Sequence, residues 1–309
     1  MLFFLFLGVR NVIKNETLEK WLIQMRRIAE HRESNSMRNI RRIYRELYKE
    51  LQSYLSNEYV TYAVDEQLSI AQLQMNARYA RFLEEIVSKT NYFTPQIEEE
   101  IMQMVIEVYE QVYNDTVDIV KKATETELDL ATQLAGLTSV PREVVIEAIN
   151  NPIYGLTLSD LLEKHRAEII YDIKRNITIG LMNNDRYSTM AKRIAKTLDG
   201  DYEKSIRIVR TEAHRVRESG SFNAANDINE TMKLGSSGYR MVKRWKTMKD
   251  ERVRKTKKAN HVKMDGKITE MDGYFDLGRG VKTLIPGNSG DAANDINCRC
   301  ICLYNISNK

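Results

Sequence analysis

A long stretch without helix-breaking residues is the feature of this 309-residue chain that most constrains its fold. Between Gly8 and Gly136 the chain contains no other glycine and a single proline, Pro95, and it is rich in Leu, Ile, Met, Glu, Arg and Gln. Glycine and proline interrupt helices most strongly, whereas those six residue types are compatible with helix. The stretch therefore predicts long helices over most of the N-terminal half.

Apolar residues between Trp21 and Tyr54 recur at spacings of three and four, which predicts an amphipathic helix or a pair of helices. This pattern leaves several arginines, Arg26 among them, for the opposite, polar face. We expect a second helix over residues 60–90 and a third that begins at Thr94-Pro95, because a hydroxyl N-cap followed by proline suits a helix start. The third helix is acidic, which indicates a solvated face or, alternatively, a face that docks on a basic partner.

Shorter helices are predicted after residue 140. Residues 157–160 form a capping sequence for a helix that ends near residue 182, and residues 183–185 predict a turn. Two more helices are expected, over residues 188–200 and 201–233, before the Gly-Ser-Ser-Gly sequence at 235–238 ends the helical region.

Beyond residue 238 the apolar residues come in short alternating bursts separated by turns that contain glycine. This pattern is typical of strands, which we expect around residues 239–241, 281–285 and 300–304. The fold class predicted for the whole chain is therefore a mainly α N-terminal region with a small α+β C-terminal domain.

The distribution of charge separates the two parts of the chain. The whole chain carries a modest net charge of +4, but residues 201–309 carry +8 and residues 1–200 carry −4. A polyanionic partner is therefore expected for the C-terminal part. The apolar segment Met1 to Val9 lacks the flanks of a signal peptide and is too short to span a bilayer. It is interpreted as a segment that packs on a partner or on the protein's own helices, with a misassigned start codon or membrane contact as alternatives.

Positive charge is most concentrated between Arg240 and Lys267, where 12 Lys and Arg accompany 3 acidic residues for a net charge of +9. Such a cluster binds phosphate backbones without sequence preference because binding releases condensed counterions. Docking on an acidic protein and a merely solvated face are the alternatives. Trp245 could stack on a base, but core packing is the favoured interpretation. The candidate nucleic-acid contacts are Lys243, Arg244, Lys246, Lys249, Arg252, Arg254, Lys255, Lys257 and Lys258.

A further polar set could carry either chemistry or structure. A carboxylate with a histidine and arginines could form a site that cleaves phosphodiesters, which would make the protein a nuclease acting through His261. No nucleophile elbow, phosphate-binding glycine loop or metal-binding carboxylate pair accompanies the set, so we favour a buried ion-pair network and no enzymatic activity. The members of this set are Arg210, Glu212, His214, Asp250, Arg252, Arg254, His261 and Asp265.

Three cysteines, Cys298, Cys300 and Cys302, lie within five residues and have no distant partner for a disulfide, as expected in a reducing cytoplasm. On a strand, alternate side chains lie about 7 Å apart, whereas thiolates on one zinc ion each lie about 2.3 Å from it. We therefore predict small buried thiols on the inner face of a final strand, with no metal and no other cofactor. A zinc site that includes His261 or His214 is the alternative.

Short motifs follow one another in a fixed order through residues 150–305. They are Arg210-Thr211-Glu212, Lys243-Arg244-Trp245 with Thr247, Asp250 with Arg252 and Arg254, His261 followed by Met264-Asp265-Gly266, and Asn297-Cys298-Arg299-Cys300. Together they resemble the C-terminal domain of tailed-phage minor head proteins, the Mu F-like head-morphogenesis family. The structural motif residues that this resemblance marks are Arg210, Glu212, Trp245, Asp250, His261, Asp265, Gly266, Asn297, Cys298 and Cys300.

The residue pattern predicts a helical interaction region over residues 1–155, and the resemblance implies a Mu F-like α+β domain over residues 156–309, with a boundary between 150 and 200. It also implies a non-enzymatic minor capsid protein, located in the virion interior and, during assembly, in the host cytoplasm. The expected partners are portal protein, capsid or scaffolding protein, and packaged double-stranded DNA bound non-specifically, with no membrane. A DNA-processing nuclease that uses a His/Asp/Arg site is the alternative. A sequence-specific DNA regulator is less favoured, because no helix-turn-helix spacing is present.

Overall fold

The computed structural model describes residues 15–150, 156–249 and 253–308, so the predictions for Met1 to Val9, Asp250 and Arg252 lie outside the described residues. The chain forms two compact units, each assembled from several segments. Unit 1 comprises residues 1–30, 107–148 and 214–309, and unit 2 comprises residues 31–106 and 149–213. The sequence-based division near residue 155 stays a prediction.

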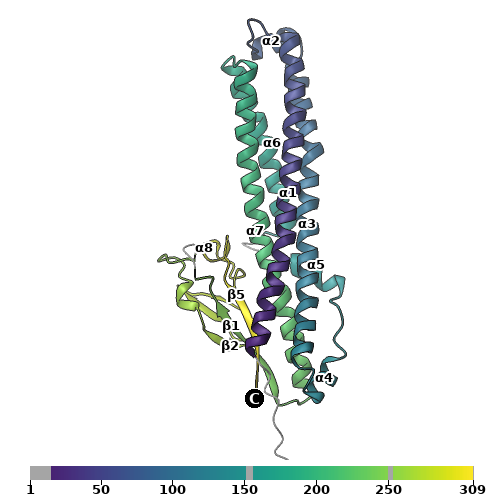
Figure 1. Ribbon diagram of the computed structural model, residues 1–309. Helices are drawn as coiled ribbons and strands as arrows, with labels where there is room; N and C mark the ends of the chain where they lie inside the picture. Colours follow the sequence, from purple (N-terminus) through teal and green to yellow (C-terminus); the bar gives the residue numbers. More distant parts are fainter. Residues whose placement is uncertain (1–14, 151–155, 250–252, 309) are drawn as a thin grey trace, which may run out of the picture. The chain divides into compact units, whose positions relative to one another are not determined.

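Long helices occupy the chain up to residue 234, and strands follow, as the sequence predicts (Figure 1). The helices are α1 (Asn15–Tyr62), α2 (Ile70–Met75), α3 (Tyr79–Ala123), α4 (Leu128–Leu134), α5 (Arg142–Asn150), α6 (Leu158–Met182) and α7 (Tyr187–Leu234). The C-terminal elements are β1 (Tyr239–Lys246), the 3₁₀ turn η1 (Val262–Met264), β2 (Ile268–Glu270), β3 (Phe275–Gly278), β4 (Val281–Thr283), α8 (Ala292–Asp295) and β5 (Ile301–Asn308). The fold class is thus mainly α with a small α+β C-terminal part.

Two helix boundaries predicted from local signals are wrong. The expected helix over residues 60–90 is interrupted, because Asp65, Glu66 and Ala77 adopt positive φ angles. Helix α3 continues through Pro95, and the Thr94 hydroxyl makes no capping hydrogen bond. Proline removes one helical hydrogen bond, but Phe93 and Ile97 on either side are buried, so tertiary packing maintains the helix.

Helix α7 is continuous where the sequence predicts two helices. Gly200 lies inside it and has open space around its Cα, while Leu198 and Ile206 continue the buried stripe on either side. A glycine in a helix interior costs about 1 kcal/mol relative to alanine, which the burial of an apolar face outweighs. The predicted start of α6 is confirmed: Thr157 and Asp160 form a capping box, and Asn184 turns the chain after the helix with a positive φ.

Unit 2 is a helical bundle built from parts of α1, α3, α6 and α7, which lie side by side in Figure 1. A buried polar chain joins three of these helices. The Ser205 hydroxyl lies 2.8 Å from His165 Nε2 and 3.0 Å from the Tyr44 hydroxyl. Burial lowers the pKa of His165 to about 4, so this histidine is neutral and its ring is accommodated in the core.

Unit 1 packs the start of α1 and the end of α7 against the C-terminal strands, and the end of α3 against α1 and α7. Helices α3 and α7 approach closely at Gly220, where an added Cβ would lie 3.0 Å from the Tyr109 carbonyl oxygen. The strands form an antiparallel sheet in the order β2-β1-β5 and a separate β3-β4 hairpin. The pairing of β1 with β5 runs from Tyr239 opposite Asn308 to Lys246 opposite Ile301. Within the described residues, no helix is long and apolar enough to cross a membrane.

Candidate functional site

The Asp-Gly turn after η1 is fastened to the end of β1. The Trp245 N–H donates to the Lys267 carbonyl, and the Gly266 N–H donates to the Trp245 carbonyl, each at 2.8 Å. The Asp265 carboxylate accepts from the Thr247 N–H at 2.8 Å. Gly266 has a φ of +80°, a conformation in which a side chain would be strained. Local turn chemistry therefore fixes where the chain leaves β1 and where it returns.

Trp245 lies in the core of this region and cannot stack on a base. Its indole packs edge-on against His261, with ring centroids 5.6 Å apart, and against Phe275, with centroids 5.2 Å apart. Aromatic pairs favour this geometry because the positive ring edge meets the negative ring face. Trp245 therefore positions the His261 ring.

His261 and two cysteines form a buried cluster. The Sγ atoms of Cys298 and Cys300 lie 3.6 and 3.4 Å from His261 Nδ1. The three ligand-type atoms lie within 4.8 Å of one another, and all three residues are buried. A cavity of ≈ 10 Å³, lined also by Met248 and Arg254, adjoins the cluster.

Cys298 and Cys300 do not lie on a strand, so the predicted separation of their thiols is wrong. Strand β5 begins at Ile301, so Cys298 and Cys300 lie in the irregular segment that precedes it. Asn297, at a φ of +55°, turns the chain immediately before them. The thiols of Cys298 and Cys300 can therefore converge, whereas Cys302 lies on the strand itself.

Hydrogen bonds from the segment of Asn294 orient the His261 ring. Its Nε2 lies 3.0 Å from the Asn294 Oδ1, and the Asn294 amide donates to Asp291 Oδ2 at 2.6 Å. An oxygen acceptor at Nε2 places the ring proton there and leaves a lone pair on Nδ1. The guanidinium of Arg254 donates to the main-chain carbonyls of Asn294 and Ile296, which secures the same segment.

His214, on α7, lies beside this cluster and is 2% exposed. Its ring is close enough to Cys298 for each group to influence the other's pKa. Burial lowers the pKa of His214, so its ring is neutral. Gly287 contacts the ring edge, because a Cβ at that position would lie 2.6 Å from His214 Cδ2.

Cys302 belongs to a different buried group, an ion pair between Arg26 and Glu218. Arg26 donates to both Glu218 oxygens and, at 2.8 Å, to the Cys302 carbonyl, while the Cys302 N–H donates to Glu218 Oε2 at 2.9 Å. The assignment of Arg26 to a polar face is wrong, since it is 4% exposed. Nothing in its spacing indicates burial, because its partner is 192 residues away in the sequence.

The basic cluster divides into buried and exposed members. Lys243 is fully buried, donates to the Met271 carbonyl at 2.8 Å and lies 4.9 Å from the Phe222 ring centroid. It cannot reach a phosphate group, so its prediction as a nucleic-acid contact is wrong. Burial lowers its pKa to about 8. Strand alternation explains this result, because residues 241, 243 and 245 share the buried face of β1.

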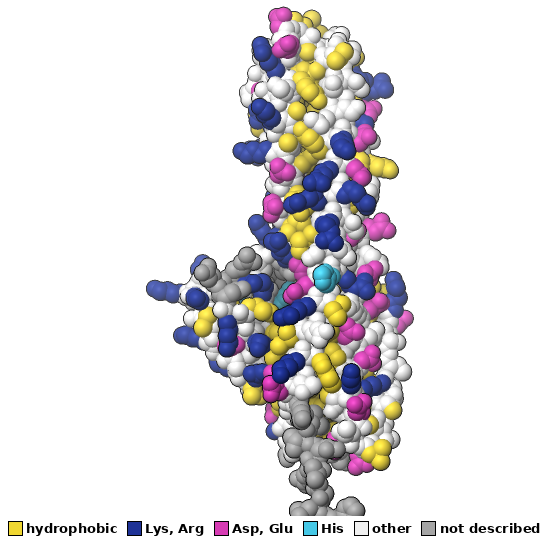
Figure 2. All heavy atoms as spheres, viewed as in Figure 1, with side chains coloured by type: hydrophobic (Ala, Val, Ile, Leu, Met, Phe, Trp, Pro, Cys, Tyr) yellow, Lys and Arg dark blue, Asp and Glu magenta, His cyan; other side chains and the backbone are white. Residues whose placement is uncertain are grey.

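Other members of the cluster remain accessible. Arg244 and Lys246 are half-buried, and Arg244 pairs with Glu19, while Lys249 pairs with Asp265 at 3.2 Å yet stays exposed. Figure 2 shows Lys and Arg side chains over the visible surface of the part of unit 1 that contains the strands. The exposed lysines of residues 246–267 are Lys249, Lys255, Lys257, Lys258, Lys263 and Lys267.

The Arg-Thr-Glu motif on α7 contains both exposed and buried side chains. Glu212 is buried, but Arg210 is exposed, so the inclusion of Arg210 in a buried network is wrong. His214, one turn after Arg210, is buried together with Arg217 in unit 1. Helical spacing alone grouped these residues and did not determine which neighbours would cover them.

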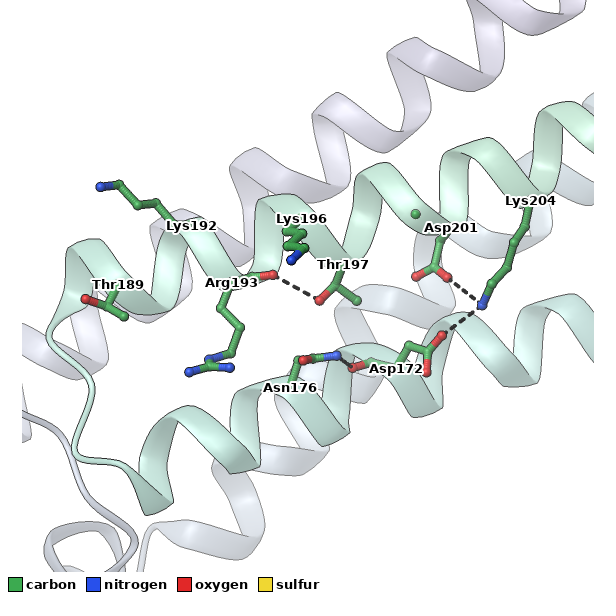
Figure 3. A pocket seen from close by; sticks show the side chains of 10 residues that line it. Asp172, Asn176, Thr189, Lys192, Arg193, Lys196, Thr197, Asp201 and Lys204 are labelled. Atoms are coloured by element: carbon green, nitrogen blue, oxygen red, sulfur yellow. Dashed lines mark hydrogen bonds and ion pairs between the residues drawn. The ribbon is translucent and has the colours of Figure 1, made fainter.

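Unit 2 contains a separate pocket of ≈ 610 Å³ between α6 and α7. Figure 3 shows the Lys204 amine between the carboxylates of Asp172 and Asp201, at 2.9 and 3.3 Å. Burial raises the pKa of Asp201 to about 7, with Asp172 and Glu168 acting in the same direction. The two carboxylates that line the pocket are therefore ion-pair partners of Lys204.

Comparison with known proteins agrees with the motifs. The family described as "Phage Mu protein F like protein" matches residues 171–303. The minor head protein GP7 of Bacillus phage SPP1 is 30% identical over 292 residues, which cover 94% of this chain and 86% of that protein. The chain belongs to the Mu F-like family of phage minor head proteins. It is thus a phage head protein, and its place is in the virion.

A second relative has a different activity in its name. The NAD(+)–arginine ADP-ribosyltransferase EFV of Enterococcus faecalis is 30% identical over 161 residues. The match spans 52% of this chain but only 31% of that protein. No solved structure matches this chain significantly.

Proposed function

We propose that this protein is a non-enzymatic minor component of the phage head that is incorporated with the portal during procapsid assembly and contacts packaged double-stranded DNA. Similarity to a minor head protein along 94% of the chain supports the structural role. The exposed lysines that follow β1 carry the proposal of DNA contact.

The sharpest basic feature is a tight turn with Lys257 and Lys258 at its tip. The Thr256 N–H donates to the Ala259 carbonyl, and the Ala259 N–H donates to the Thr256 hydroxyl, both at 3.0 Å. The turn is closed by a bridge between Lys255 and Asn260. A fixed turn that presents several cations suits a phosphate backbone and carries no means of distinguishing bases.

The affinity for linear duplex DNA across a salt series tests this contact. Reversing the charge at Lys255, Lys257 and Lys258 should weaken binding about equally on different sequences and flatten the salt dependence. The matched control reverses three exposed lysines elsewhere, Lys49→Glu, Lys164→Glu and Lys192→Glu, with the same change in net charge. Equal weakening by both triple variants, or wild-type binding that ignores salt, would contradict a specific role for the turn.

A partner surface is proposed at the end of unit 2 near α2. Val60 and Met75 are each 86% exposed, and Val64 is also exposed. Exposed apolar side chains grouped on a folded surface are typical of protein interaction sites. We assign this surface to portal protein, with capsid or scaffolding protein as the other expected partners.

Co-purification with portal protein tests this surface. Val60→Ser combined with Met75→Ser should reduce the amount of portal recovered, because the substitutions remove apolar contact area without touching the core. Leu128→Ser, at an equally exposed apolar residue of unit 1, is the control. If the double variant recovers as much portal protein as the wild type, portal protein binds another surface.

The nuclease alternative has weaker support. The His261 ring is buried, and its two nitrogens face Asn294 and the cysteines rather than solvent. A general base must reach the proton that it removes, directly or through one water. Plasmid nicking that requires a divalent metal and disappears in His261→Ala would restore this alternative.

A further inference from the structure

The buried cluster of His261, Cys298 and Cys300 has no part in the contacts proposed above. We propose that it is a structural zinc site in which His214 supplies the fourth ligand. The site would join the segment after the basic turn to the segment that leads into β5, and both to α7.

The distances suit a tetrahedral ion. Zinc lies about 2.3 Å from a thiolate and about 2.0–2.1 Å from a histidine nitrogen, so ligand atoms around one tetrahedral ion are separated by about 3.5 Å. The two sulfur-to-Nδ1 distances here are 3.6 and 3.4 Å. The three atoms therefore already occupy positions that surround one ion.

Hydrogen bonding between the thiols and the histidine accounts for this arrangement less well. With the ring proton on Nε2, where Asn294 accepts it, His261 Nδ1 has a single lone pair. Only one thiol can donate to that lone pair, yet both sulfurs are directed at it. A cation at the centre interacts with the lone pair and with both sulfurs as thiolates.

The surroundings of His261 resemble the outer shell of a metal-bound histidine. Such a histidine usually gives its second ring N–H to a carboxylate, carbonyl or similar acceptor, which fixes the ring. Here Asn294 Oδ1 has that position, and Asp291 holds the Asn294 amide at 2.6 Å. Trp245 covers the ring from the side.

His214 is the candidate for the fourth ligand. Its ring nitrogens are not among the atoms that lie within 4.8 Å of one another, so its ring has to move toward the other three ligands when the ion binds. It is buried beside Cys298, and neither of its ring nitrogens makes a well-formed hydrogen bond within the described residues. A buried imidazole without a partner is unfavourable, and coordination would satisfy one of its two nitrogens. Two sulfur and two nitrogen ligands in a closed, buried site suit zinc rather than calcium or magnesium, which prefer oxygen.

Zinc content of the full-length protein, purified without chelator and measured by elemental analysis, tests the proposal. We expect one zinc ion per chain in the wild type and loss of zinc in Cys298→Ser and Cys300→Ser. Cys302→Ser is the matched control, because Cys302 is equally buried but lies with Arg26 and Glu218. Wild-type protein without zinc after growth in supplemented medium, or zinc retained by Cys298→Ser, would overturn the proposal.

Two measurements keep the test decisive if a cysteine variant fails to fold. Cobalt bound to the wild type should give thiolate-to-metal charge-transfer absorption and tetrahedral visible bands, and cobalt bound without charge-transfer absorption would refute the ligand set. Asn294→Ala leaves all four ligands in place and should weaken zinc affinity about 10- to 100-fold in competition with a chromophoric chelator. Unchanged affinity in Asn294→Ala would contradict the role assigned to His261.

Discussion

Replacing Glu218 by glutamine tests the buried contact that joins β5 to α1 and α7. The carboxylate accepts hydrogen bonds at both oxygens: from Arg26 at Oε1, and from Arg26 and the Cys302 N–H at Oε2. A glutamine has one oxygen, so its amide N–H₂ must face a donor that the carboxylate satisfied. The substitution also leaves the Arg26 charge buried without a counter-charge.

The expected loss follows from the burial of both partners, which are 4% and 0% exposed. Removal of one partner from a buried ion pair costs about 3–5 kcal/mol of unfolding free energy, because the remaining charge is not solvated. Adding Arg26→Met removes that charge as well. The double variant should therefore be at least about 2 kcal/mol more stable than the sum of the two single losses predicts.

Urea unfolding followed by tryptophan fluorescence is the appropriate assay, because both tryptophans, Trp21 and Trp245, lie in unit 1 with the ion pair. Glu230→Gln is the control: it lies on the same helix in an exposed pair with Lys233, and we expect no measurable change. A loss below about 1 kcal/mol for Glu218→Gln, or strictly additive single losses, would refute the buried pair.

Four further predictions concern two buried titratable groups and two helix glycines. Burial lowers the pKa of Lys243 from 10.5 to about 8, so between these pH values the folded protein has released the proton that the unfolded chain still holds. As pH rises from about 8 to 10.5, the wild type should therefore gain about 3 kcal/mol of unfolding free energy relative to Lys243→Met, measured by urea unfolding. Burial raises the pKa of Asp201 from 3.8 to about 7, so wild type should lose on the order of 4 kcal/mol relative to Asp201→Asn as pH rises between those values, and a constant difference would contradict the shift. Gly220→Val should cost about 1–3 kcal/mol because its Cβ meets the Tyr109 carbonyl. Gly200→Ala, where space is open, should instead add about 0.5–1 kcal/mol in thermal unfolding.

Much of the secondary structure could be predicted from the sequence, because its causes are local. The capping box at Thr157 fixes the start of α6, and the glycines after Leu234 end α7. The errors at Pro95 and Gly200 have one physical reason. A breaking residue disfavours a helix by a few kcal/mol at most, and burial of the apolar face on both sides outweighs it.

The candidate site was only partly predictable. The motifs identify His261, Cys298 and Cys300 as a set, but their geometry depends on where β5 begins. A strand that started three residues earlier would separate the thiols, whereas the turn at Asn297 and the irregular segment after it let them converge. The exposure of the basic residues was also only partly predictable. The sequence indicates a basic cluster, but in the structure strand alternation buries Lys243 while the turn exposes Lys257.

The sequence by itself determined the order of helices and strands, the concentration of positive charge after β1 and, through its motifs, the family. Only the tertiary structure decided that Arg26 meets Glu218, that His214 lies beside Cys298, and that Lys243 is buried. Helix caps, turns and periodicity depend on neighbours within a few residues. Burial of a charge or convergence of ligands depends on segments 37 to 276 residues apart, whose meeting is set by packing of the whole chain.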